Sequence, residues 1–300
     1  MSFRLIEAEK AEHRVSRLCS VLGVTRAGYY AWRRRPPSAR RRRDVELERL
    51  LRAAFSDSLE TYGAPRLHAE LRARGVRVSK KRVARLMHEA GLQGVSRRGK
   101  RRRVVPVSGP AAPPAPDLVR RRFHASCPDE LWLADITHVP TWEGWLFLGL
   151  VMDVCTRRIV GWSMREDLQA ELVVDALGMA VTRRRPNGRV IHHSDRGSQY
   201  ASLLFGRSLR ESGLLASMGS KGDPFDNAMC ESCVSTLKEE LIKRRTWKTR
   251  EQARLAAFTY IETFYNPRRR HSSLGYLSPD EYEKMIKIEK SNDPQIATTC

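Results

Sequence analysis

The sequence predicts an α/β domain built on a mixed five-stranded sheet with flanking helices, preceded by an all-α region. Two observations predict this division. Apolar positions in the first part recur at helical spacing, whereas β-rich runs and then alternating helix and strand patterns follow from about residue 124. Charge divides at the same point: residues 1–123 carry 31 Lys and Arg against 11 Asp and Glu, and residues 124–300 carry 24 against 23. The chain therefore joins a strongly basic arm to a nearly neutral domain.

The excess of positive charge indicates a polyanionic partner. The formal net charge is +21, and Lys and Arg gain affinity for nucleic acid by releasing condensed counterions. A membrane surface is the weaker alternative, because no amphipathic anchor or lipidation motif accompanies the charge. The start has no signal-peptide core, and the longest apolar stretch, Trp145 to Met152, is too short to span a bilayer. We expect a cytoplasmic protein with reduced cysteines and no membrane partner.

Residues 1–43 are expected to form an N-terminal helical segment that ends in a basic hinge. The pattern within 12–36 predicts two short helices, because Gly23 interrupts the first run of apolar positions and Thr25 can cap the second. The hinge is residues 37–43, where a proline precedes a run of arginines.

Residues 44–95 are expected to form a helix-turn-helix-like DNA-binding domain. Helices are predicted at 45–56, about 64–74 and 79–90, and a short turn with Gly75 separates the last two. The third helix begins with basic residues and is the candidate recognition helix. Its candidate DNA-contacting residues are Lys80, Lys81, Arg82 and Arg85. The alternative interpretation is an ordinary helical hairpin with a solvated basic face.

Two segments are expected to stay outside the folded domains. Residues 96–122 combine basic residues with prolines and lack periodic apolar positions, which is typical of an extended linker. Residues 286–300 also lack apolar periodicity and are predicted to be a disordered tail.

Residues 123–285 are expected to form the α/β domain and its C-terminal helix. Three β-rich runs separated by turns predict an antiparallel meander, and the alternating runs that follow predict two more strands among helices. The strands are expected at Leu131–Val139, Trp145–Asp153, Arg158–Met164, 189–194 and 214–218, and the helices near 168–184, 198–212, 226–243 and 249–264. This order of elements is that of the ribonuclease H-like fold.

Three carboxylates are the candidate catalytic residues. Asp135 interrupts the apolar run of the first strand, Asp195 ends the fourth strand, and Glu231 lies near the start of a long helical pattern. Acids at strand ends, with one on a helix, suit a two-metal phosphoryl-transfer site, because hard oxygen ligands hold divalent ions there. The pattern indicates an enzyme that cuts and joins nucleic acid.

Residues near these acids are candidates for supporting roles. Asn227, Glu231 and Lys238 share one helix face, so Lys238 is expected to look toward the acids and contact substrate phosphate. Of His192 and His193, at most one can face Asp195, because adjacent strand residues point to opposite faces. We assign His193 a supporting role. Asp153 competes as a second-strand acid, and we interpret it as structural.

Other chemistries have less support. Cys230 and Cys233 form a C-x-x-C, but no second ligand pair follows, so two small thiols packed beneath a helix are the better interpretation than zinc. The sequence also lacks a P-loop or a dinucleotide-binding glycine pattern.

Several blocks of this sequence resemble those of one known family. They surround the three acids, follow Glu231 along its helix, and recur near the C-terminus and in the helix-turn-helix region. The matching residues are Asp135 to Thr137, His193 to Tyr200, Asp226 to Ser232, Leu237 to Glu240, Tyr265 to Pro279, Tyr62 and Gly63, and Lys81 to Met87. From about residue 12 to 284, the chain is similar to the OrfB-type transposases of insertion sequence family three, in the retroviral integrase catalytic superfamily.

The resemblance implies a DDE transposase and a role for each acid. Asp135, Asp195 and Glu231 would be the catalytic triad and the ligands of two Mg²⁺ or Mn²⁺ ions. The implied reaction cleaves DNA at an element end and joins its 3′-hydroxyl to target DNA, without a covalent intermediate. Lys238 matches the family's DNA-contacting basic position. Asn227 of the same helix face, with Arg269 and His271 of the C-terminal block, completes the candidate DNA-binding set.

The resemblance also implies partners. Double-stranded DNA, at element ends and target, is the expected ligand, and a homo-oligomer is expected on it in the bacterial nucleoid. The family usually makes its full enzyme by frameshifting from a first reading frame, so we expect a partner protein or fusion from that frame. One departure concerns packing: Cys233 and Val234 replace an aromatic pair, which we expect to loosen the packing behind Glu231.

Two other functions compete with transposition. A nuclease of the same fold would hydrolyse DNA without joining it, and a repressor would use the basic arm alone. The three acids argue against the repressor, and the DNA-binding arm with the C-terminal block disfavours a plain nuclease.

Overall fold

A computed structural model describes residues 2–96, 115–219 and 228–292. Asn227 and most of the expected linker at 96–122 lie outside the described residues, as does the end of the expected tail. Among the described residues, no helix is both long and apolar enough to cross a membrane.

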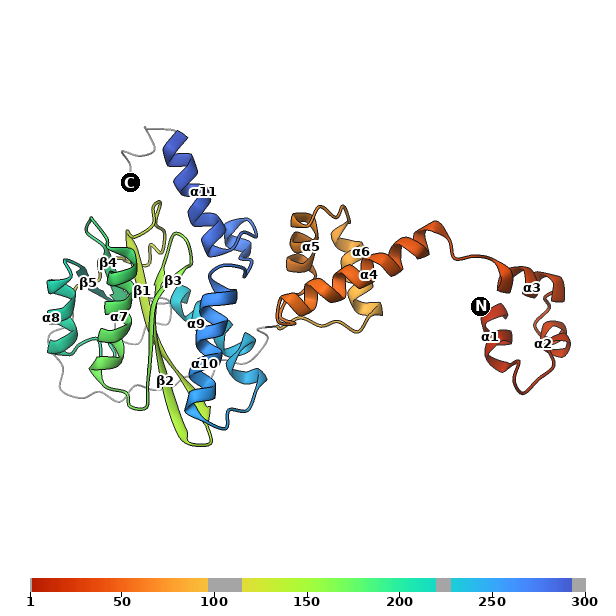
Figure 1. The fold of residues 1–300 in the computed structure, drawn as a ribbon, viewed down its shortest axis with the longest axis horizontal. Coiled ribbons are helices and arrows are strands. Elements are labelled where there is room, and N and C mark those ends of the chain that lie inside the picture. Colours follow the sequence, from red (N-terminus) through yellow and green to blue (C-terminus); the bar gives the residue numbers. More distant parts are fainter. Residues whose placement is uncertain (1, 97–114, 220–227, 293–300) are drawn as a thin grey trace.

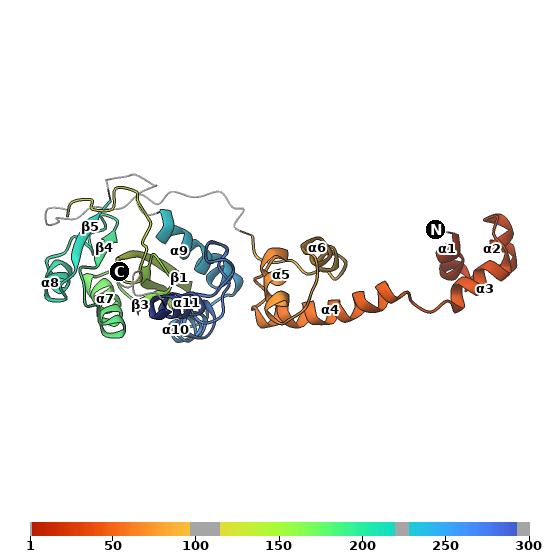
Figure 2. The same ribbon diagram turned by 90° about the horizontal axis from the view of Figure 1, so that it is seen from above.

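The first three helices form a small cluster of their own. They are α1 Ser2–Glu9, α2 Val15–Val21 and α3 Arg26–Arg34. The Thr25 side chain caps α3 by accepting a hydrogen bond from the Gly28 N–H at 3.0 Å, as its position predicts. Ile6, Cys19 and Tyr29 form the buried centre of the cluster. It lies at the far end of α4 from the sheet (Figures 1 and 2).

The predicted hinge at 37–43 is wrong beyond Ser38, because α4 already begins there. This helix runs Ala39–Asp57, and the Ser38 hydroxyl caps it by accepting a hydrogen bond from the Arg41 N–H at 3.2 Å. Arginine is a good helix former, so a run of arginines behind a Ser cap extends a helix and does not interrupt it.

The helix-turn-helix-like domain consists of α4, α5 and α6. α5 runs Ala64–Ala73 and α6 runs Lys80–Glu89, close to the predicted ranges. Gly75 in the turn has φ +77°, a conformation that favours glycine. The Ser79 hydroxyl caps α6 by accepting a hydrogen bond from the Arg82 N–H at 3.3 Å.

The α/β domain contains one five-stranded sheet in the order β3-β2-β1-β4-β5. β1 pairs antiparallel with β2, and β2 with β3, whereas β1–β4 and β4–β5 are parallel. The strands are β1 Leu131–Thr141, β2 Gly144–Asp153, β3 Ile159–Arg165, β4 Ile191–Ser194 and β5 Leu215–Met218. The topology confirms the predicted ribonuclease H-like fold.

Helices cover both faces of the sheet (Figure 1). On one face, α7 Ala170–Arg184 and α8 Leu203–Glu211 share a core with the strands. On the other, α9 Ala228–Glu240 and α10 Arg250–Thr259 belong to the larger core. That larger core also takes in α4, α5 and α6, so the helix-turn-helix-like domain packs against the α/β domain.

The chain after α10 is more regular than predicted. A π-helical turn, η2 Tyr260–Tyr265, continues α10, and α11 runs Pro279–Asn292. Two short 3₁₀ turns, η1 Ile242–Arg244 and η3 Ser272–Leu274, lie before α10 and before α11.

The predicted boundary of a tail at 286 is therefore wrong, since α11 passes through it. A capping box starts the helix: the Glu281 N–H donates to the Ser278 hydroxyl at 3.2 Å, and the Ser278 N–H donates to the Glu281 carboxylate at 2.8 Å. Ile286 then packs against the larger core.

Candidate active site

The sheet topology brings Asp135 and Asp195 to the same edge. Leu133 of β1 pairs in parallel register with His193 of β4, so the residues two positions further along lie side by side. Asp135 is still within β1, and Asp195 follows directly after β4. The structure thus places the two aspartates as the strand pattern predicted.

Asp135 lies in an acidic, partly buried environment. Burial raises the pKa of its carboxyl from the ordinary 3.8 to about 7, and the charges of Asp195 and Glu231 contribute further to the rise. A hydrogen bond from the Ile136 N–H at 2.8 Å and the charge of Lys238 act in the opposite direction. The pKa of Asp135 is therefore set by burial and by three charged side chains, those of Asp195, Glu231 and Lys238.

Asp195 is held by the turn that follows it. The Gly197 N–H donates a hydrogen bond to Asp195 Oδ1 at 3.0 Å. A Cβ at position 197 would also lie 3.0 Å from that oxygen, so glycine leaves room for the carboxylate. Burial raises the Asp195 pKa, whereas the Gly197 N–H and the nearby His193 lower it.

Glu231 approaches the aspartates from α9, which packs against β1. The neighbouring Cys230 is buried, and its pKa is raised by burial and by the charges of Asp135 and Asp195, among others. Cys233 is buried on the same side, with Sγ 3.3 Å from the Tyr265 hydroxyl. The two thiols therefore pack beneath α9, as interpreted from the sequence.

The three carboxylates do not yet form one chelating group. Within the described ranges, no three His, Cys, Asp or Glu side chains come close enough together to hold a metal ion. The electrostatic influence of Glu231 nevertheless reaches Asp135. The three acids therefore influence one another electrostatically without forming a metal-chelating group within the described residues.

Lys238 is half-buried on α9, and its charge lowers the pKa of Asp135. The same charge, after burial, lowers the pKa of His138. The His138 ring packs edge-on against Trp145, with centroids 4.8 Å apart, and Trp145 is 53% exposed. Sequence reasoning missed both residues. Their signal was weak, because polar and aromatic side chains alternate in many strands.

The two histidines of β4 face opposite sides of the sheet, as predicted. His193 Nδ1 lies 2.9 Å from the Ser217 hydroxyl and its ring packs against Phe123. His192 packs against Phe205 on the other side, and burial lowers its pKa to about 3. The proximity of His193 to Asp195 agrees with a supporting role.

Asp153 is structural, as interpreted. It is fully buried and accepts hydrogen bonds from the Asp129 N–H at 2.8 Å and from the N–H and hydroxyl of Thr156, each at 2.7 Å. Its carboxylate thus closes the turn after β2.

The candidate DNA-binding residues of α6 divide into two pairs. Lys80 and Lys81 are exposed. Arg82 and Arg85 both bind the carboxylate of Asp44 in α4, at 2.7 and 2.8 Å. These two arginines therefore hold α6 against α4, and the exposed lysines are the freer cations.

Arg269 and His271 are corrected by the structure, because both are buried. Arg269 is 3% exposed and pairs with the carboxylate of Glu240 at 2.5 Å. His271 is 9% exposed and packs edge-on against Tyr265. Their side chains are engaged inside the protein, which argues against direct contact with DNA. The sequence offered basic residues in a motif, but the buried acid that pairs with Arg269 comes from a helix 29 positions away.

The sheet order and its acidic edge define the class of ribonuclease H-like polynucleotidyl transferases. Integrase core domain models match residues 125–224 and 212–279, and an HTH-like domain model matches residues 41–101. The chain is 40% identical to the transposase for insertion sequence element IS629 of Shigella sonnei, over 96% of this chain and 98% of that protein. It is 41% identical to transposase InsF for insertion sequence IS3A of Escherichia coli K12, over 94% of this chain and 98% of that protein. The chain therefore belongs to the family of IS3-type insertion sequence transposases.

Solved structures include similar folds at low identity. The catalytic core of HTLV-2 integrase has a TM-score of 0.39 and 14% sequence identity, over 53% of this chain and 99% of that one.

Proposed function

We propose that this DDE-type transposase uses Asp135, Asp195 and Glu231 as its catalytic carboxylates, to cleave DNA at the ends of an insertion sequence and join the 3′-hydroxyl to target DNA. One observation carries the proposal. Asp135 and Asp195 stand on neighbouring parallel strands with Glu231 close enough to help raise the pKa of Asp135 to about 7. Family membership with full-length transposases supports it.

The donor set fits divalent cations. Three carboxylates are the hard oxygen ligands that Mg²⁺ and Mn²⁺ prefer, and their mutual repulsion is relieved by positive charge. The integrase core match supports dependence on a divalent metal. Bound ions, two by analogy with such sites, would polarise the phosphate and activate the attacking hydroxyl. Asp135 and Asp195 would hold them from the rigid sheet edge, and Glu231 would complete the ligand set from α9.

Four further residues would bind the DNA, and a histidine would support the site. Lys238, on the same helix as Glu231, would bind a phosphate beside the scissile bond. His193 would support Asp195, whose pKa it lowers, and the Ser217 hydroxyl beside its Nδ1 would hold the ring in position. Lys80 and Lys81 at the start of α6 would add phosphate contacts further along the duplex. Asn227 is proposed as a further DNA contact.

Assembly follows from the reaction. Two element ends and a target must be held together, so we propose a homo-oligomer on double-stranded DNA. A first-reading-frame partner or fusion would supply further end recognition. The site of action would be the bacterial nucleoid.

A strand-transfer assay with labelled end DNA tests the catalytic assignment. We expect Glu231→Gln to reduce both cleavage and joining by on the order of 100-fold, because it removes a carboxylate that would hold the ions that stabilise transition-state charge. Chelation by EDTA should abolish both activities, and added Mg²⁺ or Mn²⁺ should restore them.

The control is Glu289→Gln, which alters an exposed carboxylate of α11 and should behave as wild type. Cleavage by Glu231→Gln at the wild-type rate would refute the assignment. Cleavage without joining by the wild type would indicate a nuclease.

A further inference from the structure

One helix carries both an active-site acid and a buried acid at its opposite end. α9 has Glu231 in its first turn and Glu240 as its last residue. Glu240 is 7% exposed. Its two oxygens accept hydrogen bonds from Arg269 Nε at 2.8 Å and Nη2 at 2.5 Å, and from the Tyr260 hydroxyl at 2.7 Å. The C-terminal end of α9 is thus held by a charge-assisted, bidentate contact.

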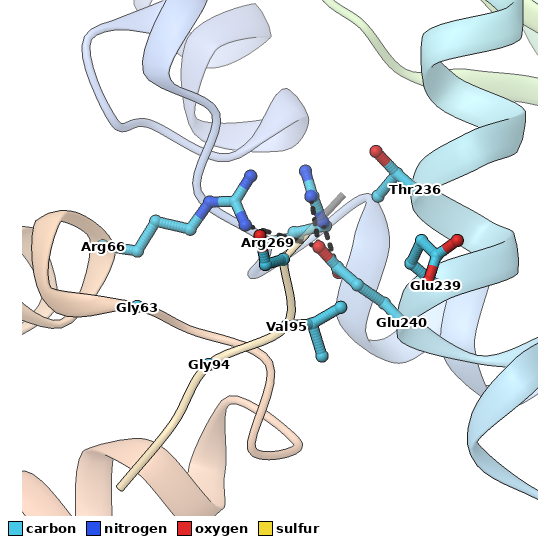
Figure 3. A pocket seen from close by; sticks show the side chains of 9 residues that line it. Gly63, Arg66, Gly94, Val95, Thr236, Glu239, Glu240 and Arg269 are labelled. Atoms are coloured by element: carbon cyan, nitrogen blue, oxygen red, sulfur yellow. Dashed lines mark hydrogen bonds and ion pairs between the residues drawn. The ribbon is translucent and has the colours of Figure 1, made fainter. Parts of the chain in front are cut away.

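The helix-turn-helix-like domain reaches the same carboxylate. Arg66 of α5 donates from Nη1 to Glu240 Oε1 at 3.3 Å, across the boundary between the two domains (Figure 3). The Arg66 guanidinium also lies 5.7 Å from the centre of the Tyr62 ring. Tyr62 itself is bound to the α/β domain, since its hydroxyl donates to the Arg268 carbonyl at 3.2 Å and accepts from the Arg270 N–H at 2.7 Å.

A second contact holds α9 near Glu231. Cys233, two residues along the helix, is within 3.3 Å of the Tyr265 hydroxyl. Tyr260 and Tyr265 begin and end the π-helical turn η2, so this one turn contacts α9 at both Glu240 and Cys233. Such turns are rare and occur often at functional sites. The orientation of α9 is therefore set by η2 and, through Arg66, by the neighbouring domain.

The boundary at Arg66 is polar and loosely packed. A cavity of about 390 Å³ lies there, lined by Gly63, Arg66, Gly94, Thr236, Glu240 and Arg269. The Arg66 side chain is 22% exposed, whereas that of Arg269 is 3% exposed. Burial and the charge of Arg269 lower the pKa of Arg66, so two guanidinium groups share one carboxylate. The Arg66 contact with Glu240 is longer and more exposed than that of Arg269.

We propose that the Arg66–Glu240 contact couples the two domains: docking of the helix-turn-helix-like domain on the end of α9 sets how closely Glu231 approaches Asp135 and Asp195. The proposal rests on the catalytic role of Glu231. DNA bound by the helix-turn-helix-like domain would then change the position of α9. Arg66 is the positioning residue in this coupling.

Manganese binding to the full chain without DNA tests this directly, because it reports the acid cluster and not the reaction. We expect Arg66→Gln to weaken Mn²⁺ affinity, measured by electron paramagnetic resonance, by about 5- to 20-fold, in the lower part of the typical range for coupling between sites. Arg66→Lys keeps the charge and should recover part of the loss. In strand transfer, Arg66→Gln should lower kcat and leave the KM for end DNA unchanged.

Arg72→Gln is the matched control, since it removes the same charge from an exposed position on the same helix. It should leave Mn²⁺ affinity within about twofold of wild type, below the range of a coupling contact. Circular dichroism and the thermal midpoint establish that each variant is folded. Tyr265→Phe is a second probe that removes the hydroxyl beside Cys233 and should also weaken Mn²⁺ binding.

A folded Arg66→Gln protein with the Mn²⁺ affinity of Arg72→Gln would overturn the coupling. That outcome is distinct from failure of the proposed function, which Glu231→Gln reports. If Glu231→Gln leaves Mn²⁺ binding and activity intact, the catalytic assignment fails. If only Glu231→Gln matters and Arg66→Gln does not, the triad stands and the coupling falls.

Discussion

At the scale of single residues, the site depends on an aspartate that the fold makes costly to ionise. Asp135 sits between Ala134, which belongs to the core on one face of the sheet, and Ile136, whose N–H binds its carboxylate. Burial is the main reason that its pKa rises to about 7, and the like charges of Asp195 and Glu231 add to the rise. Without a cation, the folded protein therefore retains a proton there near neutral pH.

We expect Asp135→Asn to stabilise the metal-free protein more at pH 8 than at pH 5. The unfolded carboxyl ionises near pH 4 and the folded one near pH 7, so wild-type stability falls as pH rises between those values. Asparagine stays neutral and avoids that loss. Thermal midpoints in EDTA at the two pH values measure the effect.

The control is Asp167→Asn, an exposed carboxyl, which should show no such pH dependence. Identical midpoints for wild type and Asp135→Asn at pH 8 would contradict the acidic cluster.

At the scale of elements, close contact between α7 and the sheet depends on a glycine in β3. A Cβ at Gly161 would lie 2.1 Å from the Ala176 carbonyl oxygen and 2.7 Å from the Ala180 nitrogen, both backbone atoms of α7. Backbone cannot move aside as a flexible side chain does, so the glycine sets the spacing between helix and sheet. Gly178, in α7 itself, has open space around it.

The two glycines should respond in opposite directions to alanine. We expect Gly161→Ala to lower the free energy of unfolding by about 1–3 kcal/mol through overpacking. Gly178→Ala should raise it by about 0.5–1 kcal/mol, because alanine is the better helix former. Urea denaturation measures both, and a neutral Gly161→Ala would show that α7 is less tightly seated than the structure indicates.

At the scale of the whole molecule, charge and chemistry lie in different parts of the chain. The excess of basic residues falls within residues 1–123, while the acids occupy the nearly neutral domain that follows. Several arginines of the basic part are already engaged: Arg82 and Arg85 bind Asp44, and Arg66 reaches Glu240. The exposed lysines at the start of α6 are therefore the better candidates for DNA phosphate.

Removing those lysines should change how DNA binding depends on salt. We expect the double variant Lys80→Ala, Lys81→Ala to reduce the slope of log affinity against log salt by about 2, close to one per phosphate contact. Fluorescence anisotropy with duplex DNA between low and moderate salt measures the slope. Lys284→Ala, on α11, is the control for charge loss elsewhere. An unchanged slope in the double variant would exclude α6 as a phosphate-binding helix.

Local patterns predicted much of this protein because the underlying causes are local. Alternation and apolar runs placed the five strands, and Ser79 and Gly75 bounded α6, since caps and turns depend on neighbouring residues. The two strand acids followed from the same patterns. The hinge at 37–43 and the tail from 286 were wrong because a cap at Ser38 and packing of Ile286 outweighed composition.

By itself, the sequence determined the fold, the strand positions of Asp135 and Asp195, and the helix face that joins Glu231 to Lys238. Only the tertiary structure decided what Arg269 does, because the acid that pairs with it comes from the end of α9. It alone also revealed that Arg66 and Glu240, 174 positions apart, link the two domains. Backbone patterns are set by near neighbours, whereas a charge's role is set by whichever distant group folding brings beside it.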